Sequence, residues 1–114
     1  MQSSAVSFDV HSFQNSGPFI VGCSVVLVSE DTILDFPKLI SHMNSKRVTI
    51  VDLVPSIWGA ILNLGLSWLS QLRVIFFGGE KMTSEIFVII CDQAQATAML
   101  VNEYGPAECT IYAT

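Results

Sequence analysis

The feature that most constrains the fold of this chain is the alternation of short apolar runs with helical patterns. The apolar runs have the length of buried strands and are rich in valine and isoleucine. They cover residues 23–28, 47–53, 73–77 and 97–101. Strands that alternate with helices are typical of a parallel sheet with helices packed on it. We therefore expect an α/β fold with a mostly parallel sheet and flanking helices.

The segments between these runs carry helix signals. Residues 35–45 repeat apolar side chains at helical spacing, and Asp35 is suited to cap that helix. Residues 55–64 have a second helical pattern, and a third begins near Thr83. The stretch 7–22 is compatible with a helix, although its Gly-Pro pair would bend or interrupt it. The predicted order is thus β–α–β–α–β–α–β.

Three loops follow the predicted strands directly and are candidates for a ligand site. They are residues 54–56, 78–80 and 102–108. Ligands of such sheets bind beyond the carboxyl ends of the strands. The pattern of strands alone therefore points to these loops.

Charged residues make up only 13% of the chain, while 51% of it is apolar. An ordinary soluble chain is about 25% charged. The deficit predicts apolar surface that other segments cover, so we expect residues 1–114 to be part of a larger domain.

The charge of the chain excludes several classes of partner. The net charge is −5 and only five residues are Lys or Arg, so no basic stripe can neutralise nucleic-acid phosphates. No basic amphipathic helix or membrane-length apolar run predicts a membrane partner. The amino terminus lacks a signal-peptide pattern, and three widely spaced cysteines suit a reducing compartment. These features favour a cytoplasmic protein.

The string Asn102-Glu103-Tyr104-Gly105-Pro106-Ala107-Glu108 combines groups that suit a nucleotide. An aromatic face beside a strand end can stack on a base, and a carboxylate can bind Mg²⁺. Gly-Pro makes the loop rigid. An isolated Tyr-Gly-Pro would more often be a plain turn.

The whole string is similar to the NxYGPTE motif of adenylate-forming enzymes, in particular the adenylation domains of nonribosomal peptide synthetases. Three further segments resemble motifs of that family in the same order. Residues 7–11 resemble its FDxS motif, 72–81 its LRxxxxGGE segment, and 48–56 its VT…PS strand and turn. The chain departs from the pattern at Ala107, where the family commonly has Thr, and at His11, where it has Ser.

The resemblance implies a site for an amino acid. Asp9 matches the aspartate that pairs with the α-ammonium, although it could instead cap the following helix. The positions that match the side-chain pocket are Val10, Phe13, Asp52, Phe76, Gly78, Glu103, Ile111 and Tyr112. Asp52 could also be a strand end that reaches solvent. If Asp52 and Glu103 both face the pocket, a cationic or polar side chain such as that of ornithine, lysine or arginine is expected.

The resemblance also implies a nucleotide site. Tyr104 would stack on adenine, and Gly79, Glu80 and Lys81 would approach its edge, although the latter two side chains could be ordinary surface residues. Asn102, Gly105 and Ala107 complete the predicted nucleotide site. Glu108 would hold Mg²⁺ near the phosphates of ATP.

The implied reaction joins an amino-acid carboxylate to AMP and then passes the acyl group to the phosphopantetheine thiol of a peptidyl carrier domain. The family's phosphate loop, ribose-binding Asp, hinge and catalytic Lys do not occur in these residues. We therefore expect the 114 residues to be inactive alone and assign no catalytic residue. One alternative is an acyl-CoA or aryl-acid ligase, whose substrate carries no ammonium for Asp9 to bind. The other is a non-catalytic relic of the fold.

Overall fold

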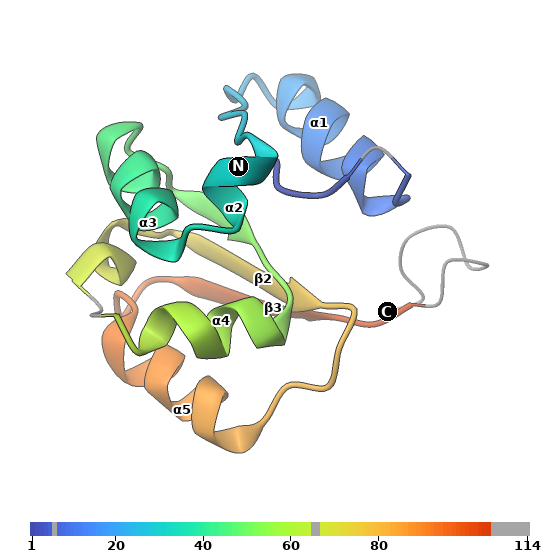
Figure 1. The fold of residues 1–114 in the computed structure, drawn as a ribbon. Helices are drawn as coiled ribbons and strands as arrows, with labels where there is room; N and C mark the ends of the chain where they lie inside the picture. The colour runs from blue at the N-terminus through green and yellow to red at the C-terminus, as the bar shows by residue number, and fades with distance from the viewer. Residues whose placement is uncertain (6, 65–66, 106–114) are drawn as a thin grey trace.

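The computed structural model describes residues 1–5, 7–64 and 67–105, and their centre is a parallel sheet. Its strands are β1 (Ile50–Asp52), β2 (Val74–Gly78) and β3 (Met99–Glu103), in that order across the sheet (Figure 1). Both strand pairs are parallel. The expected α/β architecture with a parallel sheet is confirmed.

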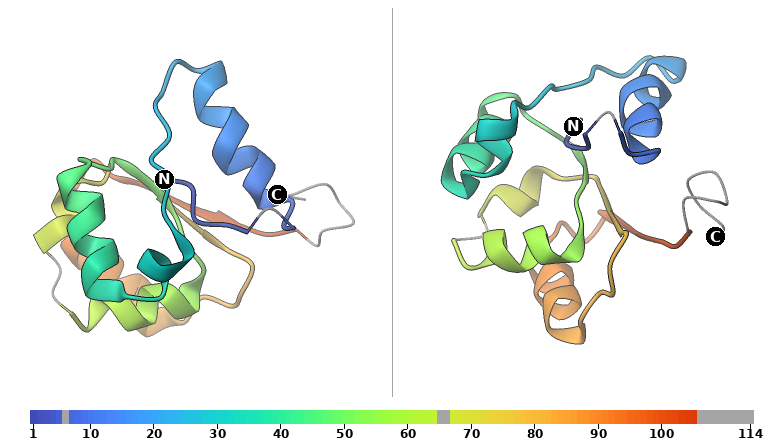
Figure 2. Two further views of the ribbon diagram at one scale, coloured as in Figure 1. Left: turned by 45° about the horizontal axis from the view of Figure 1, so that its top comes forward. Right: turned by 45° about the vertical axis from the view of Figure 1, so that its right-hand side comes forward.

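Helices cover both sides of this sheet. They are α1 (Val10–Ile20), α2 (Glu30–Ile33), α3 (Phe36–Ser45), α4 (Pro55–Leu62) and α5 (Ser84–Gln93), with a 3-10 helix, η1, at Ser67–Gln71. Helices α4 and α5 lie together on one side of the sheet, and α1 lies on the other (Figures 1 and 2). Helix α3 packs beside α4.

The main core lies between the sheet and the α4–α5 side. Val51, Ile75 and Phe77 alternate along their strands and are almost completely buried. They belong to the same buried cluster as Trp58 of α4 and Ile90 of α5. Burying one large apolar side chain contributes about 1.5–3 kcal/mol. This packing fixes the positions of the strands and hence of the loops that follow them.

The opposite face of the sheet carries the residues predicted to bind a substrate. In the register, Asp52 lies opposite Phe76, and Gly78 lies opposite Glu103. Residues two apart on a strand share a face, so these four side-chain positions belong to one face. The sheet is therefore apolar toward α4 and α5 and carries two acids on its other face.

Local hydrogen bonds explain where two of the predicted helices begin. The Asp35 carboxylate accepts from the backbone N–H of Lys38 at 3.1 Å and caps α3. The Thr83 hydroxyl oxygen accepts from the N–H of Ile86 at 3.4 Å and caps α5. Both predicted helix starts are confirmed. The uncertain stretch 7–22 contains α1, which continues through Pro18 in its last turn.

The strand predicted at residues 23–28 is wrong. This segment pairs only at one bridge, between Gln2 and Leu27, and the Leu27 side chain is exposed. Its valines favour an extended backbone, but no neighbouring strand completes a ladder. The last strand also begins later than predicted, because Ala98 closes a turn onto Gln95 at 2.8 Å before β3 starts.

Among the described residues, none of the helices combines the length and apolar character needed to span a membrane.

Candidate functional site

A cavity of about 480 Å³ lies where the three strands end. Asp52, Gly78 and Glu103 are the last residues of β1, β2 and β3, and all three line it. Asp9 and Val10 line it from the start of α1. Every charged side chain in its lining is an acid: Asp9, Asp52, Glu80 and Glu103. We call it the acidic cavity, and it unites five of the predicted substrate-binding residues.

A second cavity of about 590 Å³ adjoins the first, and we call it the tyrosine cavity. Its lining consists of Gly79, Glu80, Lys81, Met82, Asn102, Glu103, Tyr104 and Gly105. Six of the seven predicted nucleotide-binding residues are in this set. The Tyr104 side chain is 69% exposed, so its ring is open to a ligand. The two cavities share Gly79, Glu80, Glu103 and Gly105.

Asp9 both caps a helix and lines the acidic cavity. Its Oδ1 accepts from the backbone N–H of Val10 at 2.8 Å, at the start of α1. This contact matches the capping role that was the alternative to substrate binding. A carboxylate has two oxygens and about four acceptor positions, so the cap leaves acceptor capacity. The position of Asp9 in the cavity wall is therefore compatible with both roles.

Asp52 is held by hydrogen bonds and is not an open strand end. The side-chain Nε2 of Gln14 donates to Asp52 Oδ2 at 2.8 Å, and the Ser3 hydroxyl donates to the Asp52 backbone oxygen at 3.1 Å. Burial raises the pKa of the Asp52 carboxyl above its ordinary value, while the Gln14 hydrogen bond and the Met1 amine act in the opposite direction. No motif in the sequence pointed to Gln14. Its signal is a polar residue four positions after Val10, on the same side of a helix.

We expect the raised pKa of Asp52 to make the chain less stable as pH rises. The folded state retains a proton at pH values where the unfolded chain, with an ordinary pKa of about 3.9, has lost it. The free energy of unfolding should therefore fall as pH increases from about 3.9 through the raised folded value. Asp52→Asn should remove this contribution.

Denaturant unfolding across that pH range measures the effect of Asp52. Asp92→Asn removes an exposed carboxylate from α5 and is the matched control. If Asp52→Asn and the parent chain show the same pH dependence, the assignment is wrong.

Phe13 and Phe76 meet each other beside the acidic cavity without lining it. Their ring centroids are 6.1 Å apart at an interplanar angle of 80°, an edge-to-face contact. The contact joins α1 to β2 next to Asp52, which lies opposite Phe76 in the sheet. These two predicted pocket residues therefore pack behind the wall of the acidic cavity and do not line it.

The Glu80 carboxylate is engaged with the start of α4. Its Oε2 accepts from the backbone N–H of Ser56 at 2.9 Å, and its Oε1 accepts from the Ser56 hydroxyl at 3.0 Å. Helix α4 has no side-chain cap of its own from Val54, so Glu80 supplies one from another loop. Lys81 is exposed at the tyrosine cavity. The Glu80 side chain thus ties together two of the loops that sequence reasoning nominated.

Removing this cap should destabilise the fold. Glu80→Gln keeps an acceptor but loses the charge, and Ser56→Ala loses the hydroxyl donor. Each change should lower the free energy of unfolding by about 0.5–1 kcal/mol. The double variant should lose less than the sum of the two, because both changes act on one contact. Strict additivity in denaturant unfolding would argue against the contact.

Several predicted site residues lie outside the described part of the chain: Ala107, Glu108, Ile111 and Tyr112. The predicted magnesium ligand Glu108 is one of them. Among the residues that the structure describes, no three His, Cys, Asp or Glu side chains come together as a metal site.

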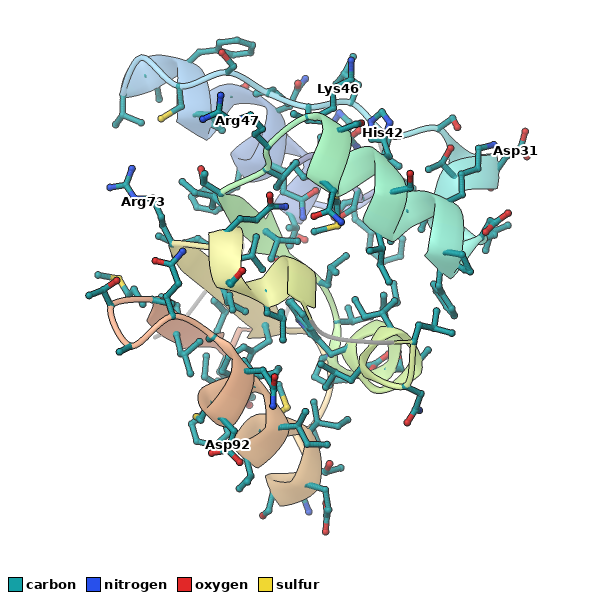
Figure 3. The ribbon with its side chains drawn as sticks, turned by 90° about the vertical axis from the view of Figure 1, so that its left-hand side faces the viewer. Asp31, His42, Lys46, Arg47, Arg73 and Asp92 are labelled. Carbon is teal, nitrogen blue, oxygen red and sulfur yellow. The ribbon has the colours of Figure 1, made fainter. Side chains whose placement is uncertain are left out.

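Basic side chains gather away from the two cavities. Figure 3 views the molecule from the side where the strands begin and shows Lys46, Arg47 and Arg73 there. Among the described basic side chains, Lys81 alone lines one of the two cavities. The carboxyl ends of the strands therefore form an electronegative region, which favours a cationic ligand group.

Comparison with known proteins decides the family. The family whose description is "AMP-binding enzyme" matches residues 1–114, the full length of the chain. The chain belongs to the AMP-binding enzyme family. The resemblance to adenylation domains that the four motifs carried is thus confirmed, and membership accounts for the shared order of those motifs along the chain.

The relatives and solved structures that this AMP-binding chain matches are much longer than the chain itself. It is 29% identical to bacitracin synthase 1 of Bacillus licheniformis over all of its length, which is 2% of that synthase. It is 34% identical to the aldehyde reductase lnaA of Aspergillus flavus, over 93% of this chain and 10% of the reductase. The structure of PA1221, an NRPS protein containing adenylation and PCP domains, has the same fold with a TM-score of 0.78 at 22% identity, over 97% of this chain and 22% of that one.

Proposed function

We propose that this AMP-binding chain is part of an adenylation domain that activates an amino acid with ATP. The observation that carries the proposal is the pair of adjoining cavities, one lined by acids and the other by an open tyrosine, with Glu103 in the wall of both. An ammonium group suits the first, and a purine suits the second. The carboxylate of the amino acid would then lie between them, next to the α-phosphate of ATP.

The acids of the first cavity support an amino acid with a cationic side chain as the substrate. Asp9 would pair with the α-ammonium by a charge-assisted hydrogen bond. Asp52 and Glu103 line the same cavity, and Glu103 is only 8% exposed. Buried carboxylates are stabilised by a cation of opposite charge. Ornithine, lysine and arginine carry such a cation, whereas leucine and phenylalanine do not.

The residues of the tyrosine cavity fit the nucleotide. The exposed ring of Tyr104 is available to stack on adenine. Gly79 has no Cβ, so the backbone can approach the purine without a side chain between them, and its φ of 76° is one that glycine adopts readily. Mg²⁺ usually takes one or two carboxylates together with substrate phosphates, so one glutamate such as Glu108 suffices. Held by Glu108 and the phosphates, Mg²⁺ would neutralise part of the phosphate charge.

In the proposed reaction, a carboxylate oxygen of the amino acid attacks the α-phosphorus of ATP. The bond to the bridging oxygen breaks, pyrophosphate leaves and an aminoacyl-AMP forms. The described residues contribute by binding and orienting the two substrates, which is a large part of such catalysis. A phosphopantetheine thiol on a carrier domain would then attack the acyl carbon, forming a thioester and releasing AMP, as the PCP domain of PA1221 suggests. Because the reaction consumes ATP, we place it in the cytoplasm.

We further propose that residues 1–114 need the remaining segments of the domain for activity. Large apolar side chains are open on the surface, including Phe8 at 65%, Ile20 at 84% and Met99 at 62% exposure. Such groups are usually covered by another part of the protein. Bacitracin synthase 1 and the aldehyde reductase lnaA each contain a segment similar to this chain, so the proposal covers the activation step that would precede either product.

ATP–pyrophosphate exchange tests the proposed function. Residues 1–114 replace the matched segment of the PA1221 adenylation domain, and the hybrid is offered single amino acids, fatty acids and aryl acids. We expect exchange with amino acids, strongest with lysine, ornithine or arginine, and none by residues 1–114 alone. Exchange only with acids that lack an amine would favour the acyl or aryl ligase. A folded hybrid without any exchange would favour a non-catalytic relic, and a preference for leucine would rule out the cationic class.

A further inference from the structure

Gln14 is a buried polar residue whose side-chain amide joins three segments of the chain. It is 6% exposed on α1 and lines the acidic cavity. Its Oε1 accepts from the backbone N–H groups of Ser3 and Ser4 at 2.9 and 3.0 Å. Its Nε2 donates to Asp52 Oδ2 at 2.8 Å. The amide therefore connects the amino-terminal segment, α1 and the end of β1.

These partners fix which end of the amide faces Asp52. Two backbone N–H donors converge on one end, so that end must be the oxygen. The NH₂ end then points at the carboxylate. The hydroxyl of Ser3 also donates to the backbone oxygen of Asp52 at 3.1 Å and holds the same segment against β1. The Gln14 amide consequently has a single orientation in this network, in which its NH₂ group donates to Asp52.

The surroundings of Asp52 make the Gln14 donor important for recognition of a positively charged substrate. No Lys, Arg or His side chain lines the acidic cavity among the described residues. A partly buried carboxylate is stable only with donors or a cation beside it. A cation on the substrate would add to the stabilisation that the Gln14 hydrogen bond gives the Asp52 carboxylate. A neutral substrate side chain would add no such stabilisation.

We propose that Gln14 is a positioning residue that holds the Asp52 carboxylate at the wall of the acidic cavity and so gives the cavity its preference for a cationic side chain. The inference rests on the proposed function, because it assumes that the amino-acid side chain enters this cavity. Gln14 acts through Asp52 and touches no reacting atom.

The ionisation of Asp52 gives a readout that a merely structural role would not move. The hydrogen bond from Gln14 lowers the pKa of Asp52, so its loss should raise that pKa. The other ionisable groups around the cavity are Asp9, Glu80 and Glu103, and the Met1 amine also favours the charged carboxylate. None of these is altered by a substitution at position 14.

The test uses residues 1–114 with Gln14→Met, Asp52→Asn and the double variant. Carboxyl NMR resonances report the pKa of Asp52. Titrations with lysine and with norleucine, which has no side-chain ammonium, report the preference for a cation. We expect Gln14→Met to raise the pKa of Asp52 and to reduce the lysine-over-norleucine preference about tenfold. In the Asp52→Asn background the same substitution should leave the preference unchanged.

Gln14→Glu is the second variant, in case Gln14→Met does not fold. It keeps an acceptor for Ser3 and Ser4 but cannot donate to Asp52, and its own carboxylate adds a negative charge there, so the pKa of Asp52 should rise more than in Gln14→Met. An unmoved pKa overturns the inference. Equal weakening of lysine and norleucine binding, or binding of neither ligand by the parent chain, also overturns it. The hybrid exchange assay is run with Gln14 unchanged, so failure of the proposed function is seen separately from failure of this inference.

Discussion

Asp9→Asn should reduce amino-acid-dependent exchange by the PA1221 hybrid between about tenfold and a hundredfold. Asparagine caps a helix as well as aspartate does, so α1 should keep its N–H contact at Val10. The substitution removes only the negative charge that would face the α-ammonium. Losing a charged hydrogen-bond partner costs about 1.5–3 kcal/mol, which corresponds to this loss of kcat/KM.

A substrate analogue separates the charge of Asp9 from general damage. The α-hydroxy acid of the same substrate keeps the side chain but has no α-ammonium, so Asp9→Asn should affect it little, and the ratio between the two substrates should shrink. Asp31→Asn, on the exposed surface of α2 (Figure 3), is the matched control and should exchange at the parent rate. Equal losses for both substrates, or full activity of Asp9→Asn, would show that Asp9 serves only as the helix cap.

Gly78→Ala should destabilise the fold by about 1–3 kcal/mol and disturb the acidic cavity. A Cβ at this position would lie 2.8 Å from the backbone oxygen of Glu103 and 3.0 Å from its Cβ. Both atoms belong to the neighbouring strand, where Gly78 and Glu103 are directly paired. The backbone oxygen cannot rotate away, so the strands must separate at the point where the two cavities meet. Denaturant unfolding measures the loss.

Gly17→Ala is the control for the loss of a glycine. A Cβ there would meet only the Phe13 ring at 3.6 Å, an ordinary contact. The gain in helix propensity is opposed by the restriction that Pro18 places on its predecessor, so we expect a change within about 0.5 kcal/mol. If Gly78→Ala were as stable as Gly17→Ala, the assignment of a close approach between β2 and β3 at the cavity would be wrong.

Much of the fold could be predicted because its determinants are local. The apolar runs around Val51 and Ile75 are strands, and Asp35 and Thr83 cap the two helices whose starts the sequence predicted. Residues 23–28 look equally strand-like, yet they form only one bridge. Strand pairing depends on a neighbour in space, and composition does not carry that information.

The candidate site divides in the same way. The family resemblance grouped Asp52, Gly78 and Glu103 in one pocket, and the structure brings them together because the carboxyl ends of parallel strands meet at one edge of a sheet. The roles of Gln14 and Glu80 could not be predicted, since each depends on contacts between distant segments, 38 and 24 residues apart. These contacts hold the site in shape, whereas the motifs contain the groups proposed to touch the substrates.

We propose that the carboxyl ends of the three strands bind an amine and a purine side by side. Amide NMR shifts of residues 1–114 during separate titrations with lysine and AMP test it most directly. We expect lysine to shift the amide resonances of Asp9, Asp52 and Glu103, and AMP to shift those of Gly79, Asn102 and Tyr104. Shifts confined to the basic surface around Arg47 and Arg73, or none for either ligand, would contradict it.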